Sequence, residues 1–142
     1  MAADALFKPF DFKGLHLKNR IVMAPMTRSF SPGGVATEDV AQYYKRRAQG
    51  EVGLIVSEGT GVDRPISVND QNVPRFHGER ALAGWKRVIE AVHEAGGVMA
   101  PQLWHVGAVR SRDPEFQPAG GYDSPSGLSS PGKKFGDRKS VV

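Results

Sequence analysis

The sequence predicts an α/β fold built on a parallel sheet, and two observations lead to this class. The first is a set of three continuous apolar runs, Ile21–Met26, Gly53–Glu58 and Val98–Trp104. Such runs are typical of strands buried on both faces, as in parallel sheets. The second is a helix-like segment between each successive pair of runs. Alternating strands and helices indicate parallel pairing through right-handed crossovers.

Two segments between the runs show helical periodicity. The first begins at Thr37, whose hydroxyl is able to cap free backbone N–H groups, and it stops at Gly50. The second ends at Gly96–Gly97 and carries one apolar stripe, formed by Leu82, Trp85, Val88, Ile89, Val92 and Ala95. In the third run, Pro101 is unable to donate to a sheet ladder, so we expect a bulge or an early strand end there.

The two ends of the sequence differ from this central pattern. Pro9–Arg20 contains two short alternating runs around Lys13-Gly14, which is the signature of a β-hairpin. After His105 the periodicity disappears, and Gly, Pro and Ser dominate. We therefore expect one folded portion over residues 1–107, followed by a loop or disordered tail over residues 108–142.

The order of elements fits two architectures. An open doubly wound sheet and a closed (β/α)8 barrel both begin with strand, helix, strand, helix and strand. A complete barrel takes about 250 residues, whereas this sequence has 142. If the architecture is a barrel, we therefore expect it to be incomplete as given.

Composition excludes several classes of protein. The sequence has no cysteine, which rules out disulfides, thiolate nucleophiles and cysteine-ligated metal or iron–sulfur sites within it. No stretch approaches the roughly 20 apolar residues of a membrane span. Met1–Phe12 contains no apolar core of a secretory signal, so we expect a cytoplasmic protein without a membrane partner.

The net charge is +4, and the basic residues form two clusters. Lys45, Arg46 and Arg47 sit on the first predicted helix, and the second cluster, in the tail, consists of Lys133, Lys134, Arg138 and Lys139. Neither cluster is interleaved with a series of aromatic stacking residues, as a platform for single-stranded nucleic acid requires. We interpret the first cluster as a solvated helix face and expect no nucleic-acid partner, although charge alone leaves a basic binding module as an alternative.

Ligands of α/β proteins bind beyond the carboxyl ends of parallel strands. The three runs end close to Thr27, Gly59, Gln102, Trp104 and His105, so these ends gather a hydroxyl, a glycine, an amide, an indole and an imidazole. An amide donates and accepts side by side, which suits the edge of a pyrimidine or flavin ring. A glycine lets a flat ring approach the backbone closely.

Other catalytic patterns are absent from the sequence. Gly59-Thr60-Gly61 lacks the third glycine of a phosphate-binding loop and does not open directly into a helix. The four histidines show neither an HExxH motif nor a paired metal spacing, and no GxSxG elbow occurs.

Three blocks carry a specific resemblance. Asn19–Arg28, Gly53–Thr60 and Gln102–Gly107 are similar, in order and spacing, to successive blocks of the Old Yellow Enzyme family, and the resemblance covers nearly all of Phe7–Gly107. It implies the N-terminal part of a (β/α)8 TIM barrel, with Pro9–Asn19 as the hairpin that covers the barrel bottom. It also implies FMN at the carboxyl ends of the strands, NADPH or NADH as the hydride donor, and an activated alkene such as an enone as the substrate.

The resemblance assigns roles to residues of the first strand end. Pro25 and Met26 resemble residues that line the flavin ring. Thr27 resembles the residue that hydrogen-bonds the flavin near its redox-active nitrogen and C4 carbonyl and so tunes its potential. Cofactor tuning through hydrogen bonds is the protein's share of flavin chemistry. We interpret Arg28 as pairing locally or closing the barrel mouth.

The other two strand ends complete the predicted site. Gly59 occupies a position beside the ring that is more often held by alanine. Gln102 resembles the amide bonded to the pyrimidine edge, and Trp104 resembles an indole that borders the substrate side. We interpret His105 as a structural hydrogen-bonding residue.

The family's remaining functional elements have no match after Gly107. These are the substrate-anchoring pair of histidine with histidine or asparagine, the proton-donating tyrosine and the loops that grip the FMN phosphate. We therefore expect no turnover from the chain alone. The alternative is a non-catalytic barrel fragment that acts only with a complementary chain, or as a homo-oligomer.

Overall fold

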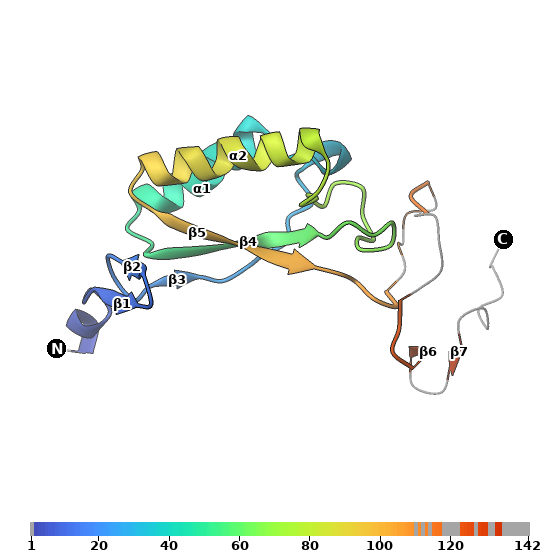
Figure 1. Cartoon of the computed structure of the whole chain (residues 1–142), viewed down its shortest axis with the longest axis horizontal. Coiled ribbons are helices and arrows are strands. Elements are labelled where there is room, and N and C mark those ends of the chain that lie inside the picture. Colours follow the sequence, from blue (N-terminus) through green and yellow to red (C-terminus); the bar gives the residue numbers. More distant parts are fainter. Residues whose placement is uncertain are drawn as a thin grey trace.

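The centre of the molecule is a three-stranded parallel sheet with the order β3-β4-β5 (Figure 1). The strands are β3 (Val22–Met23), β4 (Leu54–Gly61) and β5 (Val98–Trp104). The sheet confirms the predicted parallel α/β fold. This computed structural model describes residues 2–109, 111, 113, 115–117, 123–126, 128–130 and 133–134.

Two helices, α1 (Glu38–Gln49) and α2 (Glu79–Glu94), lie side by side over one face of the sheet. The opposite face carries no helix in the part of the chain that the structure describes (Figure 1). The core lies between helices and sheet and consists of Ala36, Val40, Ala41, Tyr44, Ala48, Ile55, Trp85, Val88 and Val92. Full burial of one large apolar side chain stabilises the fold by about 1.5–3 kcal/mol.

The helix ends agree only partly with the expected signals. Thr37 occupies the position before α1 with extended backbone, but its side chain makes no capping hydrogen bond. Gly50 follows the helix as predicted with φ of −80°, and the left-handed conformation falls on Glu51 at φ of 67°. Helix α2 ends as predicted, because Gly96 adopts φ of 72°, a conformation that suits glycine.

The first two strands differ in length from their apolar runs. Of Ile21–Met26 only Val22–Met23 pairs with β4, and the chain then leaves the sheet. Strand β4 continues through Gly61, beyond the predicted strand end. It does so because Gly61 still pairs with Trp104 and its N–H donates a 2.9 Å hydrogen bond to the Pro74 carbonyl.

A β-bulge interrupts the ladder between β4 and β5. The flanking pairs are Val56 with Ala100 and Gly59 with Gln102, so two residues of β4 lie opposite Pro101. This confirms the irregularity predicted at the proline, which lacks the N–H needed for a regular ladder.

The bulged residues are Ser57 and Glu58. The Ser57 Oγ accepts a 3.1 Å hydrogen bond from the Gln102 N–H and so satisfies that backbone group at the irregularity. The extra residue also changes which side of the sheet each side chain faces. Ile55, before the bulge, and Glu58, within it, both point to the helices, where Ile55 joins the core and Glu58 contacts Tyr44.

The predicted N-terminal hairpin is confirmed. Strands β1 (Phe10–Phe12) and β2 (Leu15–Leu17) pair antiparallel. Their two-residue turn has positive φ at both Lys13 (45°) and Gly14 (86°), as a type I′ turn requires. The hairpin lies near the end of the sheet where β4 and β5 begin (Figure 1).

The remaining short elements are the 3-10 turns η1 (Ala2–Ala5) and η2 (Pro32–Gly34) and an antiparallel pair, β6 (Leu128–Ser130) with β7 (Lys133–Lys134). The β6–β7 pair falls in the segment expected to be a loop or disordered tail, much of which lies outside the described residues. Within the described ranges, no helix combines the length and apolar character needed to cross a membrane.

The basic cluster on α1 is only partly a solvated face. Arg46 is exposed, as predicted. The prediction is wrong for its neighbours, which are half-buried. The Lys45 Nζ lies 3.3 Å from a Glu94 carboxylate oxygen on α2, and the Arg47 guanidinium lies 3.4 Å from the centre of the Tyr43 ring. The side chains of the basic cluster in the tail lie outside the described part.

Candidate functional site

Three of the predicted site residues share the helix-free face of the sheet at its carboxyl end. Gly59 pairs with Gln102, and Gly61 pairs with Trp104. Because side chains alternate along a strand, Gln102 and Trp104 face the same side, and the register places Gly59 on that side with them. This face therefore brings together an amide, an indole and a glycine that carries no side chain.

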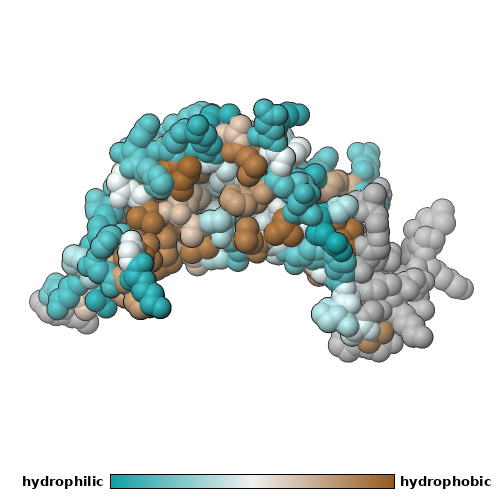
Figure 2. All heavy atoms as spheres, in the orientation of Figure 1, coloured by the Kyte–Doolittle hydropathy of each residue, from teal (hydrophilic) through white to brown (hydrophobic). Residues whose placement is uncertain are grey.

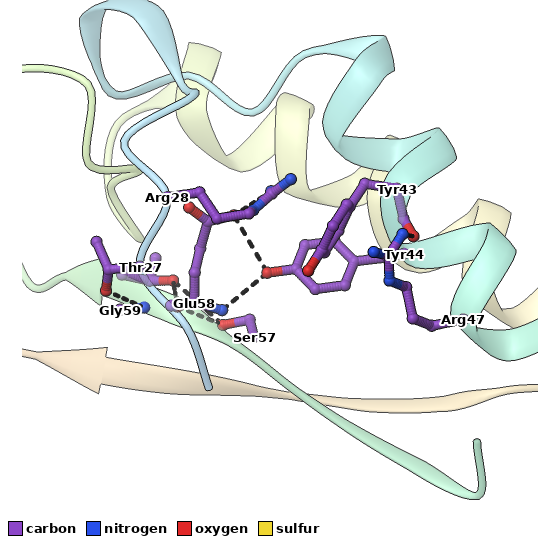
Figure 3. Close-up of polar contacts among 9 residues, drawn as sticks. Thr27, Arg28, Tyr43, Tyr44, Arg47, Ser57, Glu58 and Gly59 are labelled. Carbon is purple, nitrogen blue, oxygen red and sulfur yellow. Dashed lines mark hydrogen bonds and ion pairs between the residues drawn. The ribbon is translucent and has the colours of Figure 1, made fainter. Parts of the chain in front are cut away.

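Thr27 reaches this face from the segment that follows β3. Its Oγ accepts a 3.3 Å hydrogen bond from the Gly59 N–H (Figure 3). A threonine hydroxyl has one proton to donate, and this contact uses only its acceptor capacity. The Thr27 hydroxyl proton is thus left to donate to another acceptor.

The Trp104 indole lies directly against Gly59. A Cβ atom at position 59 would lie 2.1 Å from Trp104 Cε3, far inside the contact distance of two carbon atoms. The glycine is therefore required by the present position of the indole. This is a physical reason for glycine at a position where the family resemblance leads us to expect alanine more often.

A pocket of about 500 Å³ opens beside Thr27 and Trp104. Its volume falls in the range of small-molecule and cofactor sites. Its other lining residues are mostly polar, namely Ser29, Asn69, Asp70, Asn72, Val73, Val109, Ser111 and Asp113. The pocket places space for a ligand next to the Thr27 hydroxyl.

Pro25 and Met26 are not brought into this group. Both lie in the extended segment between β3 and Thr27, and both are exposed, with Met26 at 65%. Their role of lining the flavin ring stays a prediction.

A buried polar cluster lies behind the site, on the helix side of the sheet (Figure 3). The carboxylate of Glu58, which is fully buried, accepts hydrogen bonds from the Arg28 guanidinium, at 3.2 Å from Nε and by a shorter contact from Nη2. The Tyr44 hydroxyl lies 3.2 Å from the same carboxylate oxygen and accepts a 2.8 Å hydrogen bond from the Glu58 N–H. We call Arg28, Tyr44 and Glu58 the RYE cluster.

Sequence reasoning found only one member of the RYE cluster. The expected local pairing of Arg28 is confirmed. Tyr44 and Glu58 were not singled out, although a signal existed. A carboxylate at the end of an apolar run must find a cation or several donors, because burial of an unpaired charge costs too much.

The environment of Tyr44 keeps its hydroxyl protonated. Burial raises the pKa of Tyr44 well above its usual value, and the negative charge of Glu58 raises it further. The neutral hydroxyl is therefore able to donate to the carboxylate while it accepts from the backbone.

His105 makes hydrogen bonds on both ring nitrogens, as the predicted structural role requires. Its Nδ1 accepts a 2.9 Å hydrogen bond from the Gly107 N–H, so its Nε2 carries the proton that faces the Asp123 carboxylate at 3.0 Å. Arg64 binds the same carboxylate through two atoms. The hydrogen bonds from Arg64 hold the pKa of Asp123 below its usual value, with a smaller contribution from His105.

The sheet, its two helices and the side chains gathered at the carboxyl ends of its strands are shared with the N-terminal part of known (β/α)8 barrels. Morphinone reductase, in a structure with tetrahydroNAD, superimposes with a TM-score of 0.70 at 43% identity, over 75% of this chain and 28% of that one. An Old Yellow Enzyme homologue from Zymomonas mobilis gives 0.68 at 39% identity, over 73% and 29%. These matches confirm the incomplete barrel.

The chain belongs to the NADH:flavin oxidoreductase / NADH oxidase family, whose profile matches residues 5–140. Among curated proteins, 12-oxophytodienoate reductase 7 from Oryza sativa subsp. japonica is 41% identical over 115 residues, which are 81% of this chain and 28% of that protein. A putative 12-oxophytodienoate reductase-like protein 1 from Arabidopsis thaliana is 41% identical over 125 residues, 88% of this chain and 36% of that protein. The chain thus spans about a third of the length of these relatives.

Family membership confirms the resemblance to the Old Yellow Enzyme group. At the level of the family, it also confirms flavin and nicotinamide as the predicted cofactors. The roles of individual residues toward those cofactors stay predictions.

Proposed function

We propose that the protein containing this chain is an FMN-dependent oxidoreductase that passes hydride from NADPH or NADH to an activated alkene such as an enone. The observation that carries this proposal is the grouping of Thr27, Gly59 and Gln102 at adjoining strand ends. Family membership supports the cofactors, and the names morphinone reductase and 12-oxophytodienoate reductase among the relatives support reduction as the reaction.

The donors and acceptors of the site fit a flavin ring. The Gln102 amide would hold the pyrimidine edge, because it donates and accepts side by side. The Thr27 hydroxyl, whose acceptor side is already used by Gly59, would donate near the redox-active nitrogen and the C4 carbonyl. Pro25 and Met26 would line the ring. When bound, FMN supplies the capacity to accept and to donate hydride.

The chain's own residues orient the ring and adjust its energetics. A hydroxyl donor directed at the C4 carbonyl stabilises the electron-rich reduced ring more than the oxidised one, so Thr27 would raise the tendency of the flavin to accept hydride. Trp104, which lies against Gly59, would border the substrate side and exclude water there.

Substitution of Thr27 and Gln102 tests the site. Thr27→Ala and Gln102→Ala each remove one proposed hydrogen bond to FMN, which is worth about 1–1.5 kcal/mol, so each should raise the dissociation constant of FMN about tenfold. The measurement is titration of the FMN-free protein, followed through the visible flavin bands.

Matched controls are available at the start of helix α1 and just before it. Thr37→Ala changes a threonine that makes no capping bond, and Gln42→Ala changes an exposed amide. Both should leave FMN binding within about twofold of the parent protein. Equal FMN affinity in all four variants would remove the assignment of Thr27 and Gln102.

A second candidate is a non-catalytic fragment that acts only by docking to complementary (β/α) units. Strand β5 pairs on one edge only within the described residues. Beside it, an apolar pocket of about 280 Å³ lies between α2 and β5, lined among others by Leu82, Trp85, Ile89 and Met99. Hydrophobic residues reach the surface in this region (Figure 2).

The second candidate predicts that the isolated chain associates and is inactive. An unpaired strand edge beside exposed apolar surface favours association, so the chain should elute from size-exclusion chromatography above the monomer volume. With added FMN it should show no enone reduction. A stable, folded monomer would count against docking, and steady NADPH-dependent turnover would contradict the expected inactivity.

A further inference from the structure

The RYE cluster is joined to the proposed flavin site through adjacent residues of the chain. Arg28 directly follows Thr27, and Glu58 directly precedes Gly59. The contact between the Thr27 Oγ and the Gly59 N–H is thus flanked by Arg28 on one segment and by Glu58 on the other, and these two neighbours are themselves joined by a hydrogen bond. Figure 3 shows Tyr44 reaching from α1 to Glu58, and Thr27 reaching Gly59 on the same strand.

Stability alone does not account for this cluster. Transfer of a carboxylate and a guanidinium out of water costs several kcal/mol per ion, and well-packed apolar residues are often at least as stabilising (estimates of about 1–4 kcal/mol). The second carboxylate oxygen of Glu58 has no hydrogen-bond partner among the described residues, so the burial is not fully compensated. What the cluster does supply is a fixed geometry, because one carboxylate oxygen of Glu58, on β4, is bound both by Arg28 from the segment after β3 and by Tyr44 from α1.

Each bond of the cluster restrains the Thr27–Gly59 contact from a different side. The Arg28 guanidinium ties the segment after β3 to β4, and it also stacks on the Tyr43 ring at 3.7 Å from the ring centre. The Tyr44 hydroxyl accepts a hydrogen bond from the Glu58 N–H. The next N–H along the chain, that of Gly59, donates to the Thr27 Oγ. At 3.3 Å the bond from the Gly59 N–H to the Thr27 Oγ is longer than usual for an N–H···O hydrogen bond, so small shifts of either segment change its strength.

We propose that Arg28, Tyr44 and Glu58 are positioning residues that set the Thr27–Gly59 contact and, through the orientation of the Thr27 hydroxyl, the reduction potential of the bound flavin. The second half of this proposal rests on the proposed function. The first half concerns only the chain's own atoms and is measurable without FMN.

Tyr44→Phe tests the positioning role, with Tyr43→Phe as its matched control. Both changes remove one hydroxyl from neighbouring tyrosines of α1 and keep the ring that faces Arg28. The Tyr43 hydroxyl makes no hydrogen bond to any residue of the described part, whereas the Tyr44 hydroxyl makes two. The first readout is the hydrogen exchange rate of the Gly59 amide in the FMN-free protein. The second is the ratio of the dissociation constants of oxidised and reduced FMN, which reports the potential.

We expect Tyr44→Phe to speed exchange of the Gly59 amide and to change the FMN ratio, each by about fivefold, as loss of roughly one hydrogen bond implies. Tyr43→Phe should leave both within about twofold. If Tyr44→Phe does not fold, Arg28→Lys replaces it, since it keeps the charge and removes the two-atom contact with Glu58.

The two readouts separate the two proposals. Gly59 exchange that is the same in Tyr44→Phe and Tyr43→Phe overturns the positioning role, whether or not FMN binds. Faster exchange with an unchanged FMN ratio overturns the effect on the potential. Failure of the parent protein to bind FMN overturns the proposed function, while the exchange rates still decide the positioning role.

Discussion

Replacement of Arg28 by methionine is expected to lower the free energy of unfolding by about 3–5 kcal/mol, because it leaves the Glu58 carboxylate buried without its cation. Glu58 is fully buried and the Arg28 side chain is only 13% exposed, so water does not replace the lost partner. The measurement is the midpoint and slope of urea unfolding, followed by circular dichroism.

Two further variants make this result specific. Arg28→Met combined with Glu58→Leu removes both charges and should recover most of the loss, because no buried charge then lacks a partner. Lys45→Met breaks the pair with the largely exposed Glu94 and should cost less than about 1 kcal/mol. Losses of equal size for Arg28→Met and Lys45→Met would show that Glu58 is not dependent on its cation.

Trp85→Ala should lower the free energy of unfolding by about 3–5 kcal/mol, the cost of removing a large aromatic side chain from a core. Trp85 is 7% exposed, belongs to the core between helices and sheet, and packs 6.3 Å from the Tyr44 ring. Denaturant unfolding again measures the change.

The conservative variant at the same position separates packing from polarity. The Trp85 indole N–H is buried without a hydrogen-bond partner among the described residues, so Trp85→Phe removes an unsatisfied donor while it keeps an aromatic ring. It should cost less than about 1.5 kcal/mol. Leu82→Ala, at a position of the same predicted stripe that is 45% exposed, should cost less than Trp85→Ala. A loss for Trp85→Phe as large as that for Trp85→Ala would contradict the packing argument.

Local patterns were sufficient to predict the elements of the fold. The apolar runs located β4 and β5, the alternating runs around Lys13-Gly14 marked the hairpin, and Pro101 marked the bulge. What local patterns did not predict is where pairing stops. The length of β3 depends on where the chain must turn to bring Thr27 over Gly59, which is a tertiary contact.

The site was predictable to the same limit. Thr27, Gly59, Gln102 and Trp104 were predicted because each lies at or just after the end of an apolar run and because the family resemblance assigns roles to these positions; strand ends meet at one edge of a sheet. The structure brings these four residues together, and their roles stay predictions. The roles of Tyr44 and Glu58 required knowing that residues 14 positions apart face each other across the helix–sheet interface. Nothing in the periodicity of either segment indicates that pairing.

The bulge at Ser57–Glu58 gives this strand one residue more than a regular ladder needs. Deletion of one of these two residues would restore strict alternation, and because Ile55 and Glu58 already face the same side, the residues that follow would keep their faces. Gly59 would stay on the open side, and Thr60 would stay buried on the helix side. A residue inserted between Glu58 and Gly59 would instead exchange the two faces of the strand end without altering a single existing side chain. In this strand the bulge absorbs the loss of a residue, whereas an added residue is more damaging than many substitutions.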